Sequence, residues 1–312
     1  MRTARPALSV PAALAGAQTG AQWRAWTEAL PALATEFLDR WHLRLDGQPD
    51  HGSVALVLPV LREDGTPAVL KLQPVDAETR GEPLALRAWG GHRAVRLLDS
   101  DSATGTMLLE RLDSARSLQT LPDSTLALRH LSELLADLSR TPAPPGLPQL
   151  GEVARAMLAE LPRRVGHLAD PAERRLLTCC AAAVREVVDQ PGDRLLHWDL
   201  HYANVLAPRA DAPVPDRGCW LAIDPKPLAG DPGFELLPAL RNRWEDLAAE
   251  PSISRAVRRR FHLMTEVAGL DRQRAGAWTL ARVLQNALWD IEDGDDWLEE
   301  DQVVIAQVLL GE

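Results

Sequence analysis

Cysteine is scarce in this chain, and the three cysteines form no recognisable pattern. Cys179, Cys180 and Cys219 are the complete set in 312 residues. Their spacing matches neither a zinc site nor a redox motif, and the adjacent pair lies in an Ala/Val-rich segment typical of a packed helix. This use of cysteine fits a protein of the reducing cytoplasm.

An excess of positive charge is also lacking. The formal net charge is −10, which argues against binding to nucleic acid or to an anionic membrane, because both need basic patches that neutralise phosphates. The charge is compatible with a cationic small-molecule partner, although acidic surfaces also serve solubility alone.

Long apolar runs are lacking as well. No window approaches the roughly 20 apolar residues of a membrane span. Arg2 and Arg5 precede a mildly apolar stretch that loosely resembles an export signal, but Ser9 and Pro11 interrupt it. We therefore expect a cytoplasmic protein, as a monomer or weak dimer.

What the sequence does contain is an ordinary globular composition, with 46% hydrophobic and 25% charged residues. Its length suits two domains. Residues 1–112 predict an α+β lobe with a leading helix over 22–41, which Pro31 should kink or break. A second helix should end at Trp89, and the five antiparallel strands are expected at 43–47, 53–60, 68–73, 94–98 and 105–112.

The second lobe, residues 113–312, should be mainly helical. Helical periodicity covers 125–140, 152–168 and 171–189, and helices dominate again from about 233 to 310. A loop with four prolines separates the first two of these helices at 141–151. Two short strands near 205–207 and 220–223 flank a turn rich in proline and aspartate.

The sharpest motif is His197-Trp-Asp199-Leu-His-Tyr-Ala-Asn204, followed by Ile223-Asp224-Pro225. Its His-x-Asp-x4-Asn spacing matches the catalytic loop of protein kinases and aminoglycoside phosphotransferases. Phosphoryl transfer needs a carboxylate that accepts the proton of the attacking hydroxyl, and oxygen ligands for magnesium. Asp199 suits the first task, and Asn204 with Asp224 the second. The strand–turn–strand pattern between positions 204 and 224 predicts a hairpin that brings these two ligands together.

A lysine in an apolar strand is the second chemical feature. Lys71 lies in Ala-Val-Leu-Lys-Leu, where an unpaired ammonium would be costly. In a kinase such a lysine contacts the α- and β-phosphates of ATP and is held by a helix glutamate. Glu82 and Glu78 are the candidates, four residues apart on one expected helix. A strand-end lysine that reaches water is the alternative.

Weaker signals complete the nucleotide site. Gly52 and Ser53 lie in a turn whose backbone amides could meet phosphate oxygens, although no full glycine-rich motif is present. The backbone of Glu110 and Leu112, where the fifth strand ends, is the expected place for adenine. Asp231 is expected to cap the following helix and to brace the catalytic loop.

The whole chain resembles the aminoglycoside/hydroxyurea antibiotic resistance kinase family, with matching stretches VLKLQP, LLERLD, LLHWDLHYANVLA and WLAIDPKPLAGDPGFELLPALRNRW. The resemblance implies a bilobal protein-kinase-like fold with ATP at the lobe interface. It implies transfer of the γ-phosphate to a hydroxyl of an aminoglycoside, with Lys71 and Glu82 at the phosphates, Asp199 as base, and Asn204 and Asp224 on Mg²⁺. IDPKP in place of Asp-Phe-Gly speaks against a protein kinase.

The acceptor is less well defined than the chemistry. The helices after about residue 235 should shape its pocket, and the residues expected to line it are His201, Trp244, Asn286, Trp289 and Asp290. An acidic run over residues 292–301 would suit a cationic acceptor or a solvated helix end equally well. The alternatives to an aminoglycoside kinase are a kinase for another hydroxylated metabolite and a catalytically silent nucleotide-binding scaffold.

Overall fold

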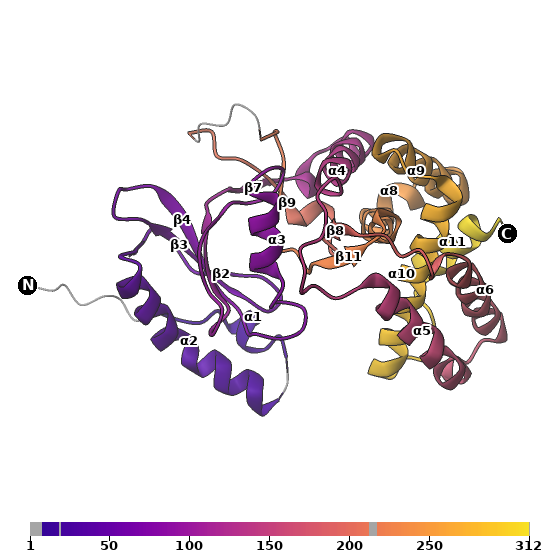
Figure 1. The fold of residues 1–312 in the computed structure, drawn as a ribbon, viewed down its shortest axis with the longest axis horizontal. Coiled ribbons are helices and arrows are strands. Elements are labelled where there is room, and N and C mark those ends of the chain that lie inside the picture. The colour runs from indigo at the N-terminus through magenta and orange to yellow at the C-terminus, as the bar shows by residue number, and fades with distance from the viewer. Residues whose placement is uncertain (1–7, 19, 212–216, 312) are drawn as a thin grey trace, which may run out of the picture. The chain divides into compact units, whose positions relative to one another are not determined.

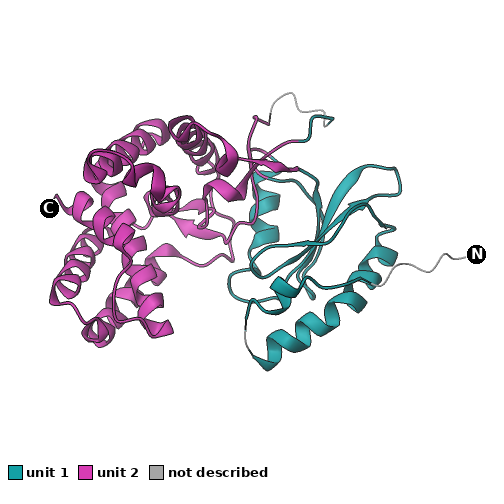
Figure 2. Cartoon of the chain, turned by 180° about the vertical axis from the view of Figure 1, so that it is seen from behind, with its two compact units in different colours: residues 1–91, 95–112, 209–212 teal, residues 92–94, 113–208, 213–312 magenta. Residues whose placement is uncertain are grey.

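The structure is a computed structural model and describes residues 8–18, 20–211 and 217–311. Arg2 and Arg5 of the signal-like segment, and residues 212–216 of the predicted turn, lie outside the described residues. The chain divides into two compact units (Figure 2). Unit 1 comprises residues 1–91, 95–112 and 209–212, and unit 2 comprises residues 92–94, 113–208 and 213–312.

Unit 1 is built on an antiparallel sheet whose strands follow the order β1-β3-β4-β6-β5, with β2 paired to β3 (Figure 1). Strand β3 alternates buried and half-buried side chains, as expected of a strand with one face on a core. The sequence predicted five of these strands and missed only the two-residue β2. The strands are β1 (Arg44–Leu45), β2 (Asp50–His51), β3 (Leu56–Leu61), β4 (Pro67–Leu72), β5 (Leu97–Asp101) and β6 (Thr106–Glu110).

Two helices precede the sheet, α1 (Ala12–Ala15) and α2 (Ala21–Arg40). Leu30, Phe37 and other buried side chains of α2 form one core with alternate residues of β3 and β4, so this helix covers one face of the sheet (Figure 1). Of the kink or break expected at Pro31, the break does not occur, because α2 runs through this residue without interruption. Packing of the apolar stripe on the sheet outweighs the one backbone hydrogen bond that proline removes.

The remaining helix of unit 1, α3 (Glu82–Trp89), begins after Glu78, the other candidate partner of Lys71. Glu78 does not belong to it. The Asp76 carboxylate accepts hydrogen bonds from the backbone N–H groups of Glu78 and Thr79 at 2.9 Å, which fixes these residues in a turn. The expectation that Glu78 and Glu82 share a helix face is therefore wrong.

Unit 2 is mainly helical, as predicted. Its central helix is α10, whose buried residues include Ala275, Trp278, Arg282 and Gln285, so it is surrounded rather than amphipathic. The helices are α4 (Ser124–Leu138), α5 (Leu150–Arg164), α6 (Pro171–Val187), α7 (Leu236–Arg241), α8 (Trp244–Ala248), α9 (Ile253–Ala268), α10 (Arg272–Asp293) and α11 (Glu300–Leu310). Short 3₁₀ turns are η1 (Leu118–Thr120), η2 (Val165–His167), η3 (Tyr202–Asn204) and η4 (Pro232–Glu235).

Two small antiparallel sheets in unit 2 carry the motif residues. One has the order β10-β9-β7 and the other pairs β11 with β8. The sequence predicted β9 (Val205–Ala207) and β10 (Leu221–Ala222). It missed β7 (Asp113–Ser117), β8 (Arg194–Leu196) and β11 (Leu228–Gly230), which are too short to show a period of their own.

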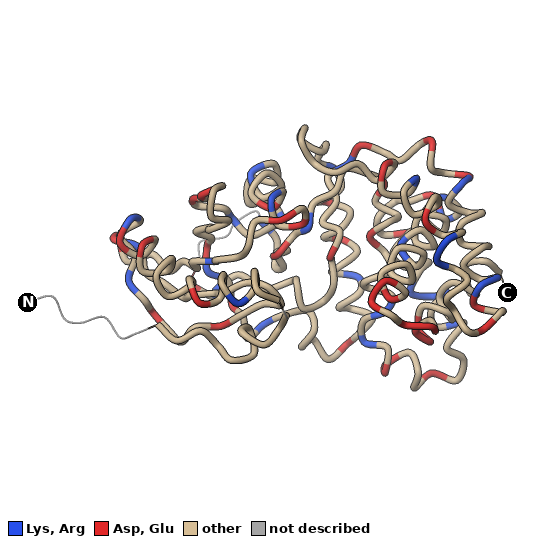
Figure 3. The backbone as a smooth tube through the Cα atoms, turned by 90° about the horizontal axis from the view of Figure 1, so that it is seen from below, with Lys and Arg blue, Asp and Glu red and all other residues tan. Residues whose placement is uncertain are grey.

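Charge is mixed along the traces of both units, with Lys or Arg positions interspersed among Asp and Glu (Figure 3). In the part of the chain that the structure describes, none of the helices is both long and apolar enough to span a bilayer.

Candidate active site

The loop that carries Asp199 connects β8 to η3 and is anchored by His197. The His197 side chain is 1% exposed, and its Nε2 donates to the backbone carbonyl of Ile223 at 2.9 Å. Burial lowers the pKa of this imidazole to about 4, in spite of the nearby Asp199 carboxylate, so the ring is neutral near pH 7. Through this contact His197 braces the loop on the backbone at Ile223.

The next residue, Trp198, holds a backbone conformation that is unfavourable for a bulky side chain, with φ at 63°. Two contacts hold it there. Its backbone N–H donates a short hydrogen bond to the Glu235 carboxylate, and its indole Nε1 donates to Gln285 Oε1 at 3.2 Å. A strained residue fixed by its surroundings directly before Asp199 indicates a preorganised loop.

Glu235 is the buried carboxylate of this site, only 2% exposed. Burial raises its pKa to about 7, although the backbone N–H groups of Trp198 and His197 and the charge of Arg282 oppose the shift. The Arg282 guanidinium lies 5.2 to 5.7 Å from the ring centres of Trp198, Phe234 and Trp289. Helix α10 thus supports the catalytic loop through Arg282 and Gln285.

The Asp199 carboxylate itself is held loosely. Its side chain is 26% exposed, with His201 Nε2 at 4.0 Å from one oxygen and Lys226 Nζ at 3.8 Å from the other. Both distances exceed those of ordinary hydrogen bonds. A partly exposed carboxylate with loose partners can still accept a proton from a bound hydroxyl.

The β9–β10 hairpin brings the two predicted metal ligands to the same end of the sheet. Val205 pairs with Ala222, and beyond that pair the backbone N–H of Ile223 donates to the carbonyl of Asn204 at 2.9 Å. The Asn204 Nδ2 donates to the Asp199 carbonyl at 3.0 Å, which turns Oδ1 in another direction. Asp224 has a φ of 59°, which aspartate tolerates better than most residues.

These two side chains offer a donor set that suits magnesium better than a softer metal. One carboxylate and one amide oxygen are hard ligands, and Mg²⁺ normally completes its shell with water and substrate phosphates. Among the described residues, no group of three or more His, Cys, Asp and Glu side chains could form an all-protein metal site. The amide of Asn204 and the carboxylate of Asp224 fit a metal whose other ligands are water and nucleotide phosphates.

A cavity of about 510 Å³ opens beside Asp199 in unit 2. Four of the five residues expected to contact an acceptor line it, whereas Trp244 begins α8 and is not among the lining residues. The lining residues are Asp199, His201, Pro238, Arg241, Asn242, Arg282, Asn286, Trp289, Asp290, Glu299 and Asp301.

The acidic run divides between this cavity and solvent. Asp301 lines the cavity and accepts from Arg241 Nε at 2.9 Å, and Glu299 pairs with the same guanidinium. Asp290, just before the run, has its pKa raised by burial and receives a long hydrogen bond of 3.5 Å from Gln302. The other acidic residues of the run are exposed, as a solvated helix end would be.

In unit 1, Lys71 and Glu82 form a buried ion pair. Lys71 Nζ donates to both carboxylate oxygens of Glu82 at 2.8 Å, and Gln73 Nε2 donates to the same carboxylate at 2.7 Å. The alternation of β4 explains the placement, because Leu70 and Leu72 face the core with α2 while Lys71 faces the other side of the sheet. The alternative of a strand-end lysine that reaches water does not apply, since Lys71 is 6% exposed.

The other residues expected at the nucleotide differ in exposure. Gly52 and Ser53 are exposed in the tight β2–β3 turn, where the Gly52 N–H donates to the Ala55 carbonyl at 3.0 Å. At the end of β6 the Glu110 N–H donates to the Arg96 carbonyl at 3.0 Å. Leu112 follows as a half-buried residue.

A family model described as the aminoglycoside/hydroxyurea antibiotic resistance kinase matches residues 40–294. The chain belongs to this family. It is 57% identical to the streptomycin 6-kinase of Streptomyces glaucescens over 292 residues, covering 94% of this chain and 93% of that protein. It is 54% identical to the hydroxyurea phosphotransferase of Kitasatospora aureofaciens, covering 100% and 88% of the two chains.

Solved structures show the fold of this resistance kinase. The aminoglycoside phosphotransferase APH(4)-Ia superposes with a TM-score of 0.56 at 14% identity, over 90% of this chain and 97% of that chain. The prediction of a kinase-like fold with an antiparallel sheet and a larger helical part is confirmed.

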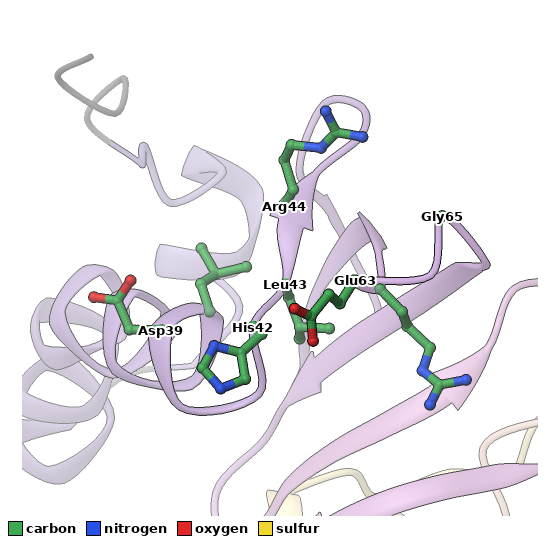
Figure 4. Close-up of a pocket in the computed structure, with 8 residues that line it drawn as sticks. Asp39, His42, Leu43, Arg44, Glu63 and Gly65 are labelled. Atoms are coloured by element: carbon green, nitrogen blue, oxygen red, sulfur yellow. The ribbon is translucent and has the colours of Figure 1, made fainter. Parts of the chain in front are cut away.

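A second cavity, of about 440 Å³, lies in unit 1 of the kinase beside the end of α2 and the β3–β4 turn. It contains none of the predicted site residues. Figure 4 shows that Arg44 points away from Asp39, His42 and Glu63, so these side chains do not converge on a ligand position.

The cap at Asp231 was predicted from sequence, whereas Glu235 and Lys226 of the kinase site were not. Asp231 caps η4 by accepting from the Gly233 N–H at 2.8 Å and pairs with Arg274 at 2.6 Å. The bond to the catalytic loop that was expected of Asp231 comes instead from Glu235, four residues later. Lys226 was also missed, although its place two residues after Asp224 was a usable signal.

Proposed function

We propose that this protein transfers the γ-phosphoryl group of ATP to a hydroxyl of a streptomycin-like aminoglycoside. The observation that carries the proposal is the position of Asp199, whose partly exposed carboxylate lines the 510 Å³ cavity of a resistance kinase. A scaffold without catalysis would need no such carboxylate.

In the proposed reaction Asp199 accepts the proton of the acceptor hydroxyl as its oxygen attacks the γ-phosphorus. The neighbouring His197 stays neutral, and Glu235 fixes the backbone before Asp199, so the base is oriented before substrate arrives. Lys71, oriented by Glu82, binds the α- and β-phosphates. Asn204 and Asp224 would hold Mg²⁺, which neutralises charge on the phosphates when it is bound.

The acceptor is proposed to contact His201, Asn286, Trp289 and Asp290. Acceptor cavities of roughly 300–1,000 Å³ enclose drug-sized molecules, so this cavity suits a multi-ring aminoglycoside better than a molecule as small as hydroxyurea. The relative from Kitasatospora aureofaciens makes hydroxyurea the second candidate acceptor. Because the reaction consumes ATP, we place it in the cytoplasm.

The test is to incubate the purified protein with magnesium and ATP against streptomycin, other aminoglycosides and hydroxyurea, and to detect phosphorylated product by mass spectrometry. We expect one phosphoryl group on streptomycin, at one position and with an equal amount of ADP. Turnover of hydroxyurea alone would reassign the acceptor. The absence of any phosphorylated product, with ATP bound, would support the scaffold instead.

A further inference from the structure

One wall of the acceptor cavity carries an exposed tryptophan. Of the ten tryptophans in the chain, two are exposed, Trp297 at 53% and Trp289 at 41%. Trp289 lines the cavity together with Asp199, whereas Trp297 follows α10 and is not among the lining residues. The Trp289 ring is therefore within reach of a bound acceptor, and its other contacts lead towards the catalytic loop.

Helix α10 carries Trp289 on the same face as the residues that hold this loop. Positions 282, 285 and 289 are three and four residues apart, so their side chains share one face of the helix. Gln285 Oε1 accepts from the Trp198 indole at 3.2 Å, and the Arg282 guanidinium donates to the same oxygen. One face of α10 thus extends from the residue before Asp199 to the wall of the cavity.

The Trp289 ring contacts both members of this support. Its centre lies 6.4 Å from the centre of the Trp198 indole, a separation typical of interacting aromatic pairs. The Arg282 guanidinium lies 5.2 Å from the centre of Trp289 and 5.6 Å from that of Trp198, so one cation attracts both rings. Because Trp198 is held at a φ of 63° directly before Asp199, a shift of its indole would displace the base.

We propose that Trp289 is a positioning residue, whose contacts with Arg282 and Trp198 keep the loop before the catalytic base in place. This inference rests on the proposed function. Loss of the ring would leave a void beside Arg282, and Trp198 would relax from its strained backbone conformation. Asp199 would move with it, and small displacements of a catalytic group reduce its rate. A tryptophan that only contacted the acceptor would change acceptor affinity alone.

The experiment compares wild type with Trp289→Leu, Trp289→Phe, Trp198→Leu and the double variant with leucine at both positions. Trp297→Leu is the matched control, because it removes an exposed tryptophan of unit 2 that does not line the cavity. For each protein we would measure kcat and KM for streptomycin, the hydrolysis of ATP by water, and the melting temperature. Hydrolysis by water is the decisive rate, since no acceptor is then present to contact Trp289.

We expect Trp289→Leu to lower kcat and the rate of ATP hydrolysis by the same factor, about 10- to 10²-fold. The KM for streptomycin should also rise, because the ring lines the cavity. Trp289→Phe should recover most of both rates, and Trp297→Leu should match wild type. The double variant should be little slower than Trp198→Leu alone, because the second substitution removes a contact that is already lost.

Three results would overturn the positioning role. The first is a Trp289→Leu kcat and hydrolysis rate within threefold of wild type with only a higher KM, which would leave the residue as an acceptor contact. The second is additive losses in the double variant, since Trp289 would then not act through Trp198. If Trp289→Leu also lowers the melting temperature, Trp289→Phe decides. Recovery of the rate supports the ring contact, and a loss equal to that of Trp289→Leu is the third contrary result.

Failure of the proposed acceptor would be seen separately. If wild type hydrolyses ATP but phosphorylates no acceptor, the assignment of an aminoglycoside fails, and the hydrolysis rates of the variants still decide the role of Trp289. If wild type does neither, both proposals fail.

Discussion

The two lysines of the chain stand beside carboxylates in very different ways. In unit 1, Lys71 and Glu82 are 2.8 Å apart and their side chains are 7% and 2% exposed. In unit 2, Lys226 and Asp199 are 3.8 Å apart and 42% and 26% exposed. The first pair is closed and supported by Gln73. The second is open, with a longer distance and more exposed side chains.

Removal of the carboxylate from the open pair should have the largest effect. We expect Asp199→Asn to lower kcat by at least about 10²- to 10⁴-fold, because the amide cannot accept the proton of the hydroxyl. ATP affinity should change little, since Asp199 is not proposed to bind the nucleotide. Single-turnover phosphorylation and ATP titration by calorimetry would check this. Equal losses of binding and turnover would contradict the role of a base.

Disruption of the closed pair, Lys71 and Glu82, should lower the free energy of unfolding. Glu82→Ala leaves the Lys71 ammonium buried without its carboxylate, and loss of one partner of a buried pair costs about 3–5 kcal/mol in free energy of unfolding. Lys226→Met should cost less than about 0.5 kcal/mol, as an exposed substitution does. Urea unfolding of the two variants measures the contrast directly. A similar loss for both would remove the distinction between closed and open pairs.

The hydrogen bond from the Trp198 N–H to Glu235 should make kcat depend on pH. The Glu235 pKa is raised to about 7 by burial, and the charged groups that act on it are Arg282 and Asp199. Ionised Glu235 is the better acceptor for the Trp198 N–H, so wild-type kcat should fall as pH decreases through about 7.

Glu235→Gln should lose this inflection and turn over about 10-fold more slowly at pH 8, since small displacements of a catalytic group reduce its rate. Because both proteins would be assayed with the same saturating substrates, ionisation of ATP cancels in the comparison. An inflection that persists unchanged in the variant would show that Glu235 does not control the loop.

The smallest effect is expected at the rim of the acceptor cavity. Asp290→Asn should raise KM for streptomycin about 10-fold with kcat nearly constant, because one charge-assisted contact is worth about 1.5 kcal/mol. The KM for ATP should not change. Glu292→Gln is a suitable control, since Glu292 belongs to the exposed part of the acidic run. An equal change in both variants would indicate long-range attraction of the cation instead of contact.

Sequence analysis predicted the residues whose contacts join segments that are close in the sequence. Asn204 and Asp224 are joined by one hairpin, and the cost of burying Lys71 predicts a carboxylate partner nearby. The hairpin and the need for a buried partner follow from strand patterns, whereas the preference for Glu82 over Glu78 came from the family resemblance.

The remaining residues depend on contacts between distant segments. Glu235 contacts Trp198 from 37 positions away in the sequence, and Gln285 contacts it from 87 positions away. No local sequence pattern predicts a contact at either separation. The lining of the acceptor cavity has the same origin, because α7, α10 and α11 contribute to it together with the catalytic loop. The break predicted at Pro31 was wrong for the opposite reason. The local rule that proline ends a helix was overridden by packing of α2 on the sheet.

The most direct measurement is a crystal structure with a non-hydrolysable ATP analogue, magnesium and streptomycin. The account predicts one acceptor hydroxyl oxygen within about 2.6–3.2 Å of an Asp199 carboxylate oxygen and in line with the γ-phosphorus. An acceptor bound outside the cavity, or an Asp199 carboxylate with no hydroxyl in reach while the γ-phosphate is in place, would contradict it.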